Sequence, residues 1–296
     1  MDPIVIEGLS KFYGERLGIR DIDLAVPEGS LYGFLGPNGA GKTTTIRTLL
    51  GLLRPSRGSA QIFGRDCWRQ SPKIKADLGY VPGDLRLYPW MTGKSALAVV
   101  GKFRGRDLRV RGADLAKRFD LEMEVRVRNM SRGMRQKLGL LLALAHEPKL
   151  LILDEPTTAL DPLMQQWFYG ILRNMAQEGA TVFFSSHTLS EVEDLCDHVA
   201  VVRQGRLVTA APLEDLKKRA QREVVLVWQE DLPGMKGSIP EFLNVFRKQK
   251  REWHCSLSGP VMPLVRWASE QPLADIRIGK PNLESMFRRF YEEEAP

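Results

Sequence analysis

The segment GPNGAGKT, residues 36–43, has the residue types and spacing of a loop that binds phosphate groups. Its glycines let the backbone bend so that successive N–H groups point at phosphate oxygens, and a helix that follows adds its positive end. Lys42 would place its ammonium group on the β- and γ-phosphates, and the Thr43 hydroxyl would ligate Mg²⁺. The predicted triphosphate contacts are Gly36, Pro37, Asn38, Gly39, Ala40, Gly41, Lys42, Thr43 and Thr44. The loop predicts binding of ATP with Mg²⁺; a glycine-rich turn that only caps a helix is the alternative.

Two adjacent carboxylates end the apolar stretch LLILDEP, residues 150–156. Open parallel sheets bind ligands at the carboxyl ends of their strands, so Asp154 and Glu155 are expected beside the phosphate loop. Phosphoryl transfer needs a metal anchor and a group that positions the attacking water. We therefore assign Asp154 to the Mg²⁺ shell and Glu155 to the water, as a catalytic residue.

His187 ends a third apolar stretch, VFFSSH. A histidine at such a place is often only a structural hydrogen-bonding group. Here it would share the sheet edge with Glu155, where an imidazole can contact the γ-phosphate. The order of the three motifs favours His187 as a second catalytic residue.

Strands and helices alternate along most of the chain and must position these groups. This alternation predicts an α/β fold, a P-loop NTPase sandwich with a mainly parallel sheet and an antiparallel β edge. Residues 1–218 are expected to form the ATP-binding domain, with a helical subdomain at about 84–137. Residues 219–296 are predicted to form a small α+β accessory domain, with strands expected at EVVLVWQ and HCSLSG.

The composition of the 296-residue chain, 43% hydrophobic and 27% charged, is typical of a globular protein. No run approaches the roughly 18 apolar residues of a membrane span, and the first residues lack the layout of a signal peptide. Cys67, Cys196 and Cys255 show neither paired nor metal-type spacing, so reduced thiols are expected. These features predict a cytoplasmic protein.

The net charge of +7 is concentrated in one segment. Residues 102–137 hold twelve Lys and Arg against five Asp and Glu, which leaves the rest of the chain close to neutral. A solvated helical face explains this, and a surface near anionic lipid or nucleic acid is the alternative. Only Phe103 and Phe119 could stack on bases there, which argues against a single-strand binder.

With these motifs in this order, residues 1–218 resemble the ATP-binding subunit of an ABC transporter. The C-terminal NLESMFRRFYEE resembles the tail of ATPases of the drug and antibiotic exporter group. The resemblance implies a head-to-tail homodimer around two MgATP, driving a separate permease docked on residues 84–130 and holding the subunit to the inner face of the cell membrane. It also implies that Tyr13 stacks on adenine.

The family's signature, leucine-serine-glycine-glycine-glutamine, contacts the nucleotide held by the other subunit. Here it reads MSRGM, residues 130–134, so Ser131 and Gly133 are kept while Arg132 and Met134 differ. We interpret Ser131 and Gly133 as a working variant that contacts ATP; an impaired half-site or a plain helix cap are the alternatives. TTALD, residues 157–161, resembles the loop through which the subunits meet.

One departure from the family concerns the segment YVPGD, residues 80–84. The family usually has a glutamine after YVP, where it meets Mg²⁺ and the attacking water, and this chain has Gly83. Asp84 could replace it as a metal ligand through a water molecule, or take no part.

Two other functions compete with that of a transport motor. A soluble ABC-type ATPase acting on ribosomes or nucleic acid has only the basic segment in its favour, so a nucleic-acid partner is not expected. A regulatory ATP-binding subunit with weak hydrolysis would follow if the changes at Arg132, Met134 and Gly83 were disabling.

Overall fold

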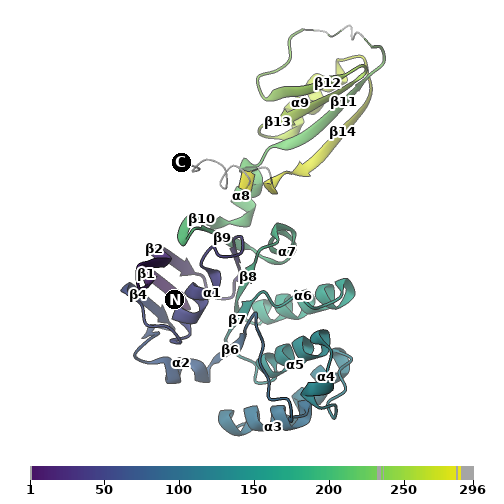
Figure 1. The fold of residues 1–296 in the computed structure, drawn as a ribbon. Coiled ribbons are helices and arrows are strands. Elements are labelled where there is room, and N and C mark those ends of the chain that lie inside the picture. The colour runs from purple at the N-terminus through teal and green to yellow at the C-terminus, as the bar shows by residue number, and fades with distance from the viewer. Residues whose placement is uncertain (1, 232–234, 236, 285, 288–296) are drawn as a thin grey trace. The chain divides into compact units, whose positions relative to one another are not determined.

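The structure is a computed structural model that describes residues 2–231, 235, 237–284, 286 and 287. The chain divides into two compact units, Met1–Ala210 and Ala211–Pro296 (Figure 1). The division precedes helix α8, Leu213–Arg219, whereas the boundary expected at residue 218 falls inside that helix.

An antiparallel sheet forms one layer of the first unit. Its strands are β1 (Ile4–Tyr13), β2 (Arg16–Val26), β4 (Arg57–Ile62) and β5 (Arg65–Asp66), in the order β2-β1-β4-β5. Buried and exposed residues alternate at the end of β2, which is the pattern of a sheet with one face on a core. This sheet is the predicted antiparallel β edge.

A second, largely parallel sheet carries the motifs. Its strands are β3 (Leu31–Leu35), β6 (Leu78–Val81), β7 (Leu150–Asp154), β8 (Thr181–Ser186), β9 (His198–Arg203) and β10 (Arg206–Pro212), in the order β10-β9-β3-β8-β7-β6. β3, β7 and β8 are buried throughout, as expected for strands covered on both faces. Leu35 pairs with Ser186 and Asp154 pairs with Ser185, so the three strands end at one edge.

Helices cover the second sheet on both faces. Helix α1 (Lys42–Leu49) contacts β2, β4 and β7, so it lies between the two sheets (Figure 1). Its residues Ile46 and Leu49 belong to the main core. Helices α6 (Pro162–Gln177) and α7 (Leu189–Leu195) contact β3 and β8. This is the sandwich that the sequence predicts. The short helix α2 (Ser71–Ala76) and strand β6 were not predicted.

Helices α3 (Gly93–Arg104), α4 (Arg109–Arg118) and α5 (Arg132–Leu144) pack together, with a short 3₁₀ helix η1 at Val127–Asn129 (Figure 1). They form the predicted helical subdomain. Several basic side chains of this segment have partners inside the unit. Arg109 pairs with Asp107, and Arg111 and Arg118 pair with Asp114. Both aspartates are among the five acids of residues 102–137, so the excess of positive charge in this segment remains.

The second unit is the expected α+β appendage. It contains α8, β11 (Arg222–Trp228), β12 (Leu243–Gln249), β13 (Glu252–Leu257), α9 (Val261–Ser269) and β14 (Leu273–Pro281). The antiparallel sheet has the order β12-β13-β11-β14, and Trp228, Cys255 and Leu264 belong to its core. Among the residues that the structure describes, no helix combines the length and the apolar character that crossing a membrane requires. The C-terminal tail sequence NLESMFRRFYEE lies mostly outside the described residues.

Candidate active site

The segment from Gly36 to Thr43 connects β3 to α1, as its motif predicts. Two glycines in it have no acceptable replacement. A Cβ on Gly36 would lie 2.4 Å from the carbonyl oxygen of Val202, and Gly41 has a φ of 105°. Glycine is therefore required both for close backbone approach and for the left-handed turn into α1. The first N–H groups of α1 then face the loop, which is the arrangement that binds anions.

Lys42 is buried at 4% exposure, and its ammonium group is aimed back into the loop. Nζ donates to the carbonyl oxygens of Gly36 at 2.7 Å and Pro37 at 3.2 Å. It also lies 3.1 Å from Glu155 Oε1. A buried ammonium must be paired, and three oxygen atoms satisfy its three donors.

Asp154 and Thr43 supply two oxygen atoms side by side. Thr43 Oγ1 donates to Asp154 Oδ2 at 3.0 Å, and Ser185 Oγ donates to the other carboxylate oxygen at 2.7 Å. Asp154 is 2% exposed, and Ser185 fixes its orientation. Burial raises the pKa of nearby Tyr80 to about 12, and the charge of Asp154 adds to this effect. Hydroxyl and carboxylate oxygens are the ligands that Mg²⁺ takes in nucleotide sites, so this pair fits the predicted metal position.

Glu155 occupies a strained position at the end of β7. Its φ is 49°, in the left-handed region that residues with side chains rarely adopt. Its backbone N–H donates to Ser185 O at 3.2 Å, and its Oε2 lies 3.2 Å from His187 Nδ1. Strain of this kind persists where the surroundings enforce it and is concentrated at functional sites. The structure thus brings together the two residues predicted to be catalytic.

A pocket of about 520 Å³ opens in front of the loop. Its lining contains Tyr13, Asn38, Gly39, Gly41, Lys42, Thr43, Thr44 and Glu155 from the predicted site. The Tyr13 hydroxyl lies 3.4 Å from Thr44 Oγ1, and the ring is 45% exposed at the pocket. Arg16 and Arg47 also line it and were not predicted. Arg47 lies one helical turn after Thr43 and Thr44, so the spacing along α1 could have identified it.

Ser131 and Gly133 do not line this pocket. Ser131 is exposed and caps α5, where its Oγ accepts a hydrogen bond from Met134 N at 3.1 Å. A Cβ on Gly133 would lie 3.1 Å from Ala159 O, which places it against the 157–161 loop. Asp161 caps α6 and accepts a hydrogen bond from Met164 N at 2.9 Å. Within one chain these residues form a surface of their own.

Gly83 and Asp84 are placed differently from each other. A Cβ on Gly83 would lie 3.2 Å from Asp154 O and 3.7 Å from Asp154 Oδ2, so the backbone of residue 83 lies beside the predicted metal ligand. The Asp84 carboxylate is exposed and pairs with Arg86, with an N–O distance of 2.9 Å. Its role as a metal ligand stays a prediction.

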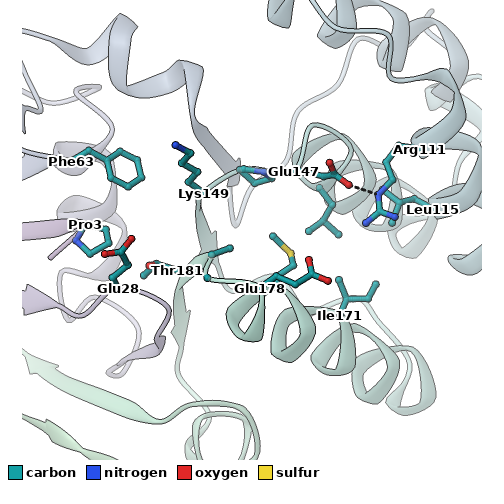
Figure 2. Close-up of a pocket in the computed structure, with 15 residues that line it drawn as sticks. Pro3, Glu28, Phe63, Arg111, Leu115, Glu147, Lys149, Ile171, Glu178 and Thr181 are labelled. Carbon is teal, nitrogen blue, oxygen red and sulfur yellow. Dashed lines mark ion pairs between the residues drawn. The ribbon is translucent and has the colours of Figure 1, made fainter. Parts of the chain in front are cut away.

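A larger pocket, of about 670 Å³, lies at the opposite end of the parallel strands (Figure 2). Lys149 precedes β7 and Thr181 begins β8, so this pocket is at the amino ends of these strands. An ion pair between Arg111 Nε and Glu147 Oε1, 3.5 Å apart, lies on one side of it (Figure 2). None of the predicted site residues lines it. The chemistry-bearing residues therefore mark the smaller pocket.

Comparison with known proteins agrees with this assignment. The model of the ABC transporter family matches residues 19–158. The chain is 38% identical over 217 residues to the bacitracin transport ATP-binding protein BcrA of Bacillus licheniformis, covering 72% of this chain and 71% of that protein. It is 32% identical over 296 residues to the Nod factor export ATP-binding protein I of Ralstonia nicotianae, covering 96% and 92%. The daunorubicin resistance ATP-binding protein DrrA3 of Streptomyces coeruleorubidus is 36% identical over 219 residues, covering 72% and 69%.

Solved structures show the same similarity. An ATP-binding subunit of an ABC transporter aligns with a TM-score of 0.69 at 28% identity, covering 72% of this chain and 91% of that chain. An ATP-bound bacterial Atm1-family ABC exporter aligns with a TM-score of 0.66 at 26% identity, covering 73% of this chain and 39% of that chain. Both alignments leave about a quarter of this chain unmatched.

Proposed function

Because the chain belongs to the ABC transporter family as one of its ATP-hydrolysing subunits, we propose that two copies enclose two MgATP and drive a separate membrane permease. The direction we propose is export. Its support is that relatives over most of the chain are named for bacitracin transport, daunorubicin resistance and Nod factor export. The substrate itself is selected by the permease.

The observation that carries the proposal is the shared position of Glu155 between Lys42 and His187. A triphosphate in the loop competes with Glu155 for the Lys42 ammonium, because phosphate oxygens are strong acceptors for it. Glu155 is then left to accept the proton of the attacking water, while His187 donates to the γ-phosphate. The hydrogen bond from Glu155 N to Ser185 O supports the strained backbone conformation that directs the carboxylate to this point.

Thr43 and Asp154 would hold Mg²⁺, which when bound neutralises charge on the β- and γ-phosphates. Ser185 keeps Asp154 in place for this role through its hydrogen bond. Tyr13 lies at the mouth of the pocket, where its exposed ring can stack on a base.

The second subunit supplies what one chain lacks at this pocket. Ser131 Oγ and the N-terminus of α5 form an anion-binding arrangement outside the pocket of the chain's own phosphate loop, because neither Ser131 nor Gly133 lines that pocket. The head-to-tail dimer would bring them to the partner's γ-phosphate. The serine and glycine kept in this variant signature are the residues that such contacts need.

The permease partner is expected on the helical subdomain. Tyr88 and Trp90 are 66% and 68% exposed and stack with ring centroids 5.7 Å apart, and Phe103 on α3 is 88% exposed. Exposed aromatic side chains of this kind mark protein interaction surfaces. Docking there would hold the subunit at the cytoplasmic face of the membrane.

The test is Glu155→Gln in the full-length protein, extracted from native membranes in mild detergent. We expect the variant to bind MgATP, to accumulate as a dimer, and to hydrolyse ATP at least about 100-fold more slowly, because the proton acceptor is lost. A protein with many membrane spans should be extracted together with it. ATP turnover is measured with purified protein and dimerisation by light scattering.

Two results would contradict the proposal. Hydrolysis at the parent rate would remove Glu155 from the mechanism. Recovery with ribosomes or DNA, and without any membrane protein, would favour the soluble ATPase instead.

A further inference from the structure

The carboxylate of Glu191, in the first turn of α7, accepts hydrogen bonds from two hydroxyl groups, one in the loop after β7 and one at the end of β8. Thr157 Oγ1 donates to Oε1 at 2.5 Å, and Ser186 Oγ donates to Oε2. The side chain is partly buried. Burial raises the pKa of the neighbouring Tyr169 hydroxyl, and the charge of Glu191 adds to the effect. Glu191 thus lies where the loop after β7, the end of β8 and helix α6 meet.

On one side Glu191 fixes the strand end that carries His187. Ser186 Oγ accepts a hydrogen bond from Thr188 N at 2.9 Å and has two acceptors for its single hydrogen, of which Glu191 Oε2 is closer than Thr188 O at 3.3 Å. Ser186 directly precedes His187, and His187 Nδ1 lies 3.2 Å from Glu155 Oε2. A displacement of His187 would therefore move Ser186 and change its hydrogen bond to the Glu191 carboxylate.

On the other side Glu191 holds the 157–161 loop. Gln165 Nε2 on α6 donates to the carbonyl oxygens of Thr157 and Leu160, both at 3.2 Å. The buried Gln136 Nε2 on α5 donates to Pro156 O at 2.7 Å. Helix α5 is the one that Ser131 caps. The loop is thus connected to the helix carrying the signature as well as to α7.

We infer that Glu191 is a positioning residue that joins the His187 strand end to the 157–161 loop. Contact of His187 with a γ-phosphate is thereby transmitted to the surface that meets the second subunit. The protein then dimerises when a triphosphate is bound and not when a diphosphate is bound. The inference rests on the proposed function, because it needs a nucleotide-dependent dimer. Both hydroxyls donate to the same carboxylate, and an amide at residue 191 would offer an acceptor to only one of them.

A purely structural role for Glu191 is the alternative. A carboxylate in the first turn stabilises a helix through the helix dipole. Loss of that effect would lower thermal stability and would leave the nucleotide dependence of dimerisation unchanged. The two roles therefore differ in which quantity the substitution changes.

The experiment places Glu191→Gln in the Glu155→Gln protein, with Asp194→Asn as the matched control. Asp194 is exposed on the same helix, and its substitution makes the same change of charge. The dissociation constant of a fluorescent ATP analogue, the thermal midpoint and the MgATP-dependent dimer fraction are measured for each. We expect nucleotide affinity within about twofold of the parent, because the phosphate loop is intact, and dimerisation weakened roughly tenfold, because the loop is no longer held. The control should dimerise as the parent does.

Thr157→Val serves as a second variant because it removes one hydroxyl and keeps the volume. It should weaken MgATP-dependent dimerisation in the same way, even if Glu191→Gln fails to fold. Parent-like dimerisation of either variant, or a loss of nucleotide affinity equal to the loss of dimer, would overturn the inference. If the Glu155→Gln parent itself stays monomeric in MgATP, the dimer of the proposed function fails instead.

Discussion

The phosphate-loop region and the Ser131–Gly133 segment differ in how completely one chain builds them. In the first region, Lys42 pairs with Glu155, and Asp154 accepts hydrogen bonds from Thr43 and Ser185. Lys42 and Asp154 are buried. In the second, Ser131 is exposed and its hydroxyl only caps its own helix. A reaction shared between two chains requires two parts from each chain. One is a pre-organised half-site, and the other is an exposed helix end that can bind the nucleotide of the partner. Variants in the two regions should therefore fail differently.

The largest effect is expected from Lys42→Ala, within the region that one chain completes. The substitution removes the point charge that we propose holds the β- and γ-phosphates, and it leaves His187 as the ion-pair partner of Glu155. We expect ATP turnover to fall at least about 100-fold, because removal of one preorganised electrostatic donor typically has that effect. Steady-state ATPase assays and ATP-analogue binding measure the loss.

Lys149→Ala is the matched control for this prediction. Lys149 is an exposed lysine at the other end of the sheet, in the pocket of Figure 2. It should keep turnover within about twofold, since surface substitutions away from such features have small effects. A large loss of turnover in Lys149→Ala together with parent-like turnover of Lys42→Ala would instead favour the pocket of Figure 2.

The self-contained region could be predicted from the sequence because its signals are local. The phosphate loop lies in consecutive residues, and parallel strand ends share one edge, so Asp154, Glu155 and His187 were expected together. Strands β12 and β14 were missed. Their residues LNVFRKQ and LADIRIGKP are largely exposed, so the apolar alternation that identifies a strand is weak.

The contacts that connect the two regions could not be predicted. Ser185, Gln136 and Glu191 are ordinary residues in their local sequence. Their partners Asp154, Pro156 and Thr157, in that order, lie 20 to 34 positions away. Glu191 in particular sits in LSEVEDL, where an acidic residue in the first turn of a helix needs no other reason. The role of Ser185 comes from the pairing of β8 with β7, and those of Gln136 and Glu191 come from the packing of α5, α6 and α7 around one loop.

A smaller effect, of a different kind, is expected from Ser131→Ala. The loss of one hydrogen bond to a charged group should lower turnover about tenfold without changing the affinity of a single chain for ATP. Mixing Ser131→Ala with Lys42→Ala should restore activity in part. A mixed dimer joins the intact loop of one chain to the intact signature of the other, and so contains one complete site.

Thr92→Ala separates this effect from a loss of stability. Thr92 caps α3 and accepts a hydrogen bond from Ser95 N, so both variants should lose about 1 kcal/mol of a helix cap. Thr92→Ala should keep turnover near that of the parent. If mixing Ser131→Ala with Lys42→Ala gives no more than the sum of the separate activities, Ser131 acts only as a cap and the two regions are independent.

The smallest effect is expected from Gly83→Ala, which tests how much displacement of Asp154 the self-contained region tolerates. The added methyl group would lie 3.2 Å from Asp154 O and 3.7 Å from the carboxyl carbon, so Asp154 must give by a few tenths of an ångström. Loss of a group that orients a metal ligand typically costs about 10- to 100-fold in metal affinity, and a small shift that keeps every partner should cost less, roughly threefold. A Mg²⁺ titration of ATP turnover measures the change in metal affinity.

Gly170→Ala is the control, because its added Cβ meets nothing within 4 Å and alanine suits the middle of α6. An unchanged Mg²⁺ requirement in Gly83→Ala would mean that the metal position tolerates displacement of Asp154, and Thr43 would then carry more of the binding than the buried carboxylate does.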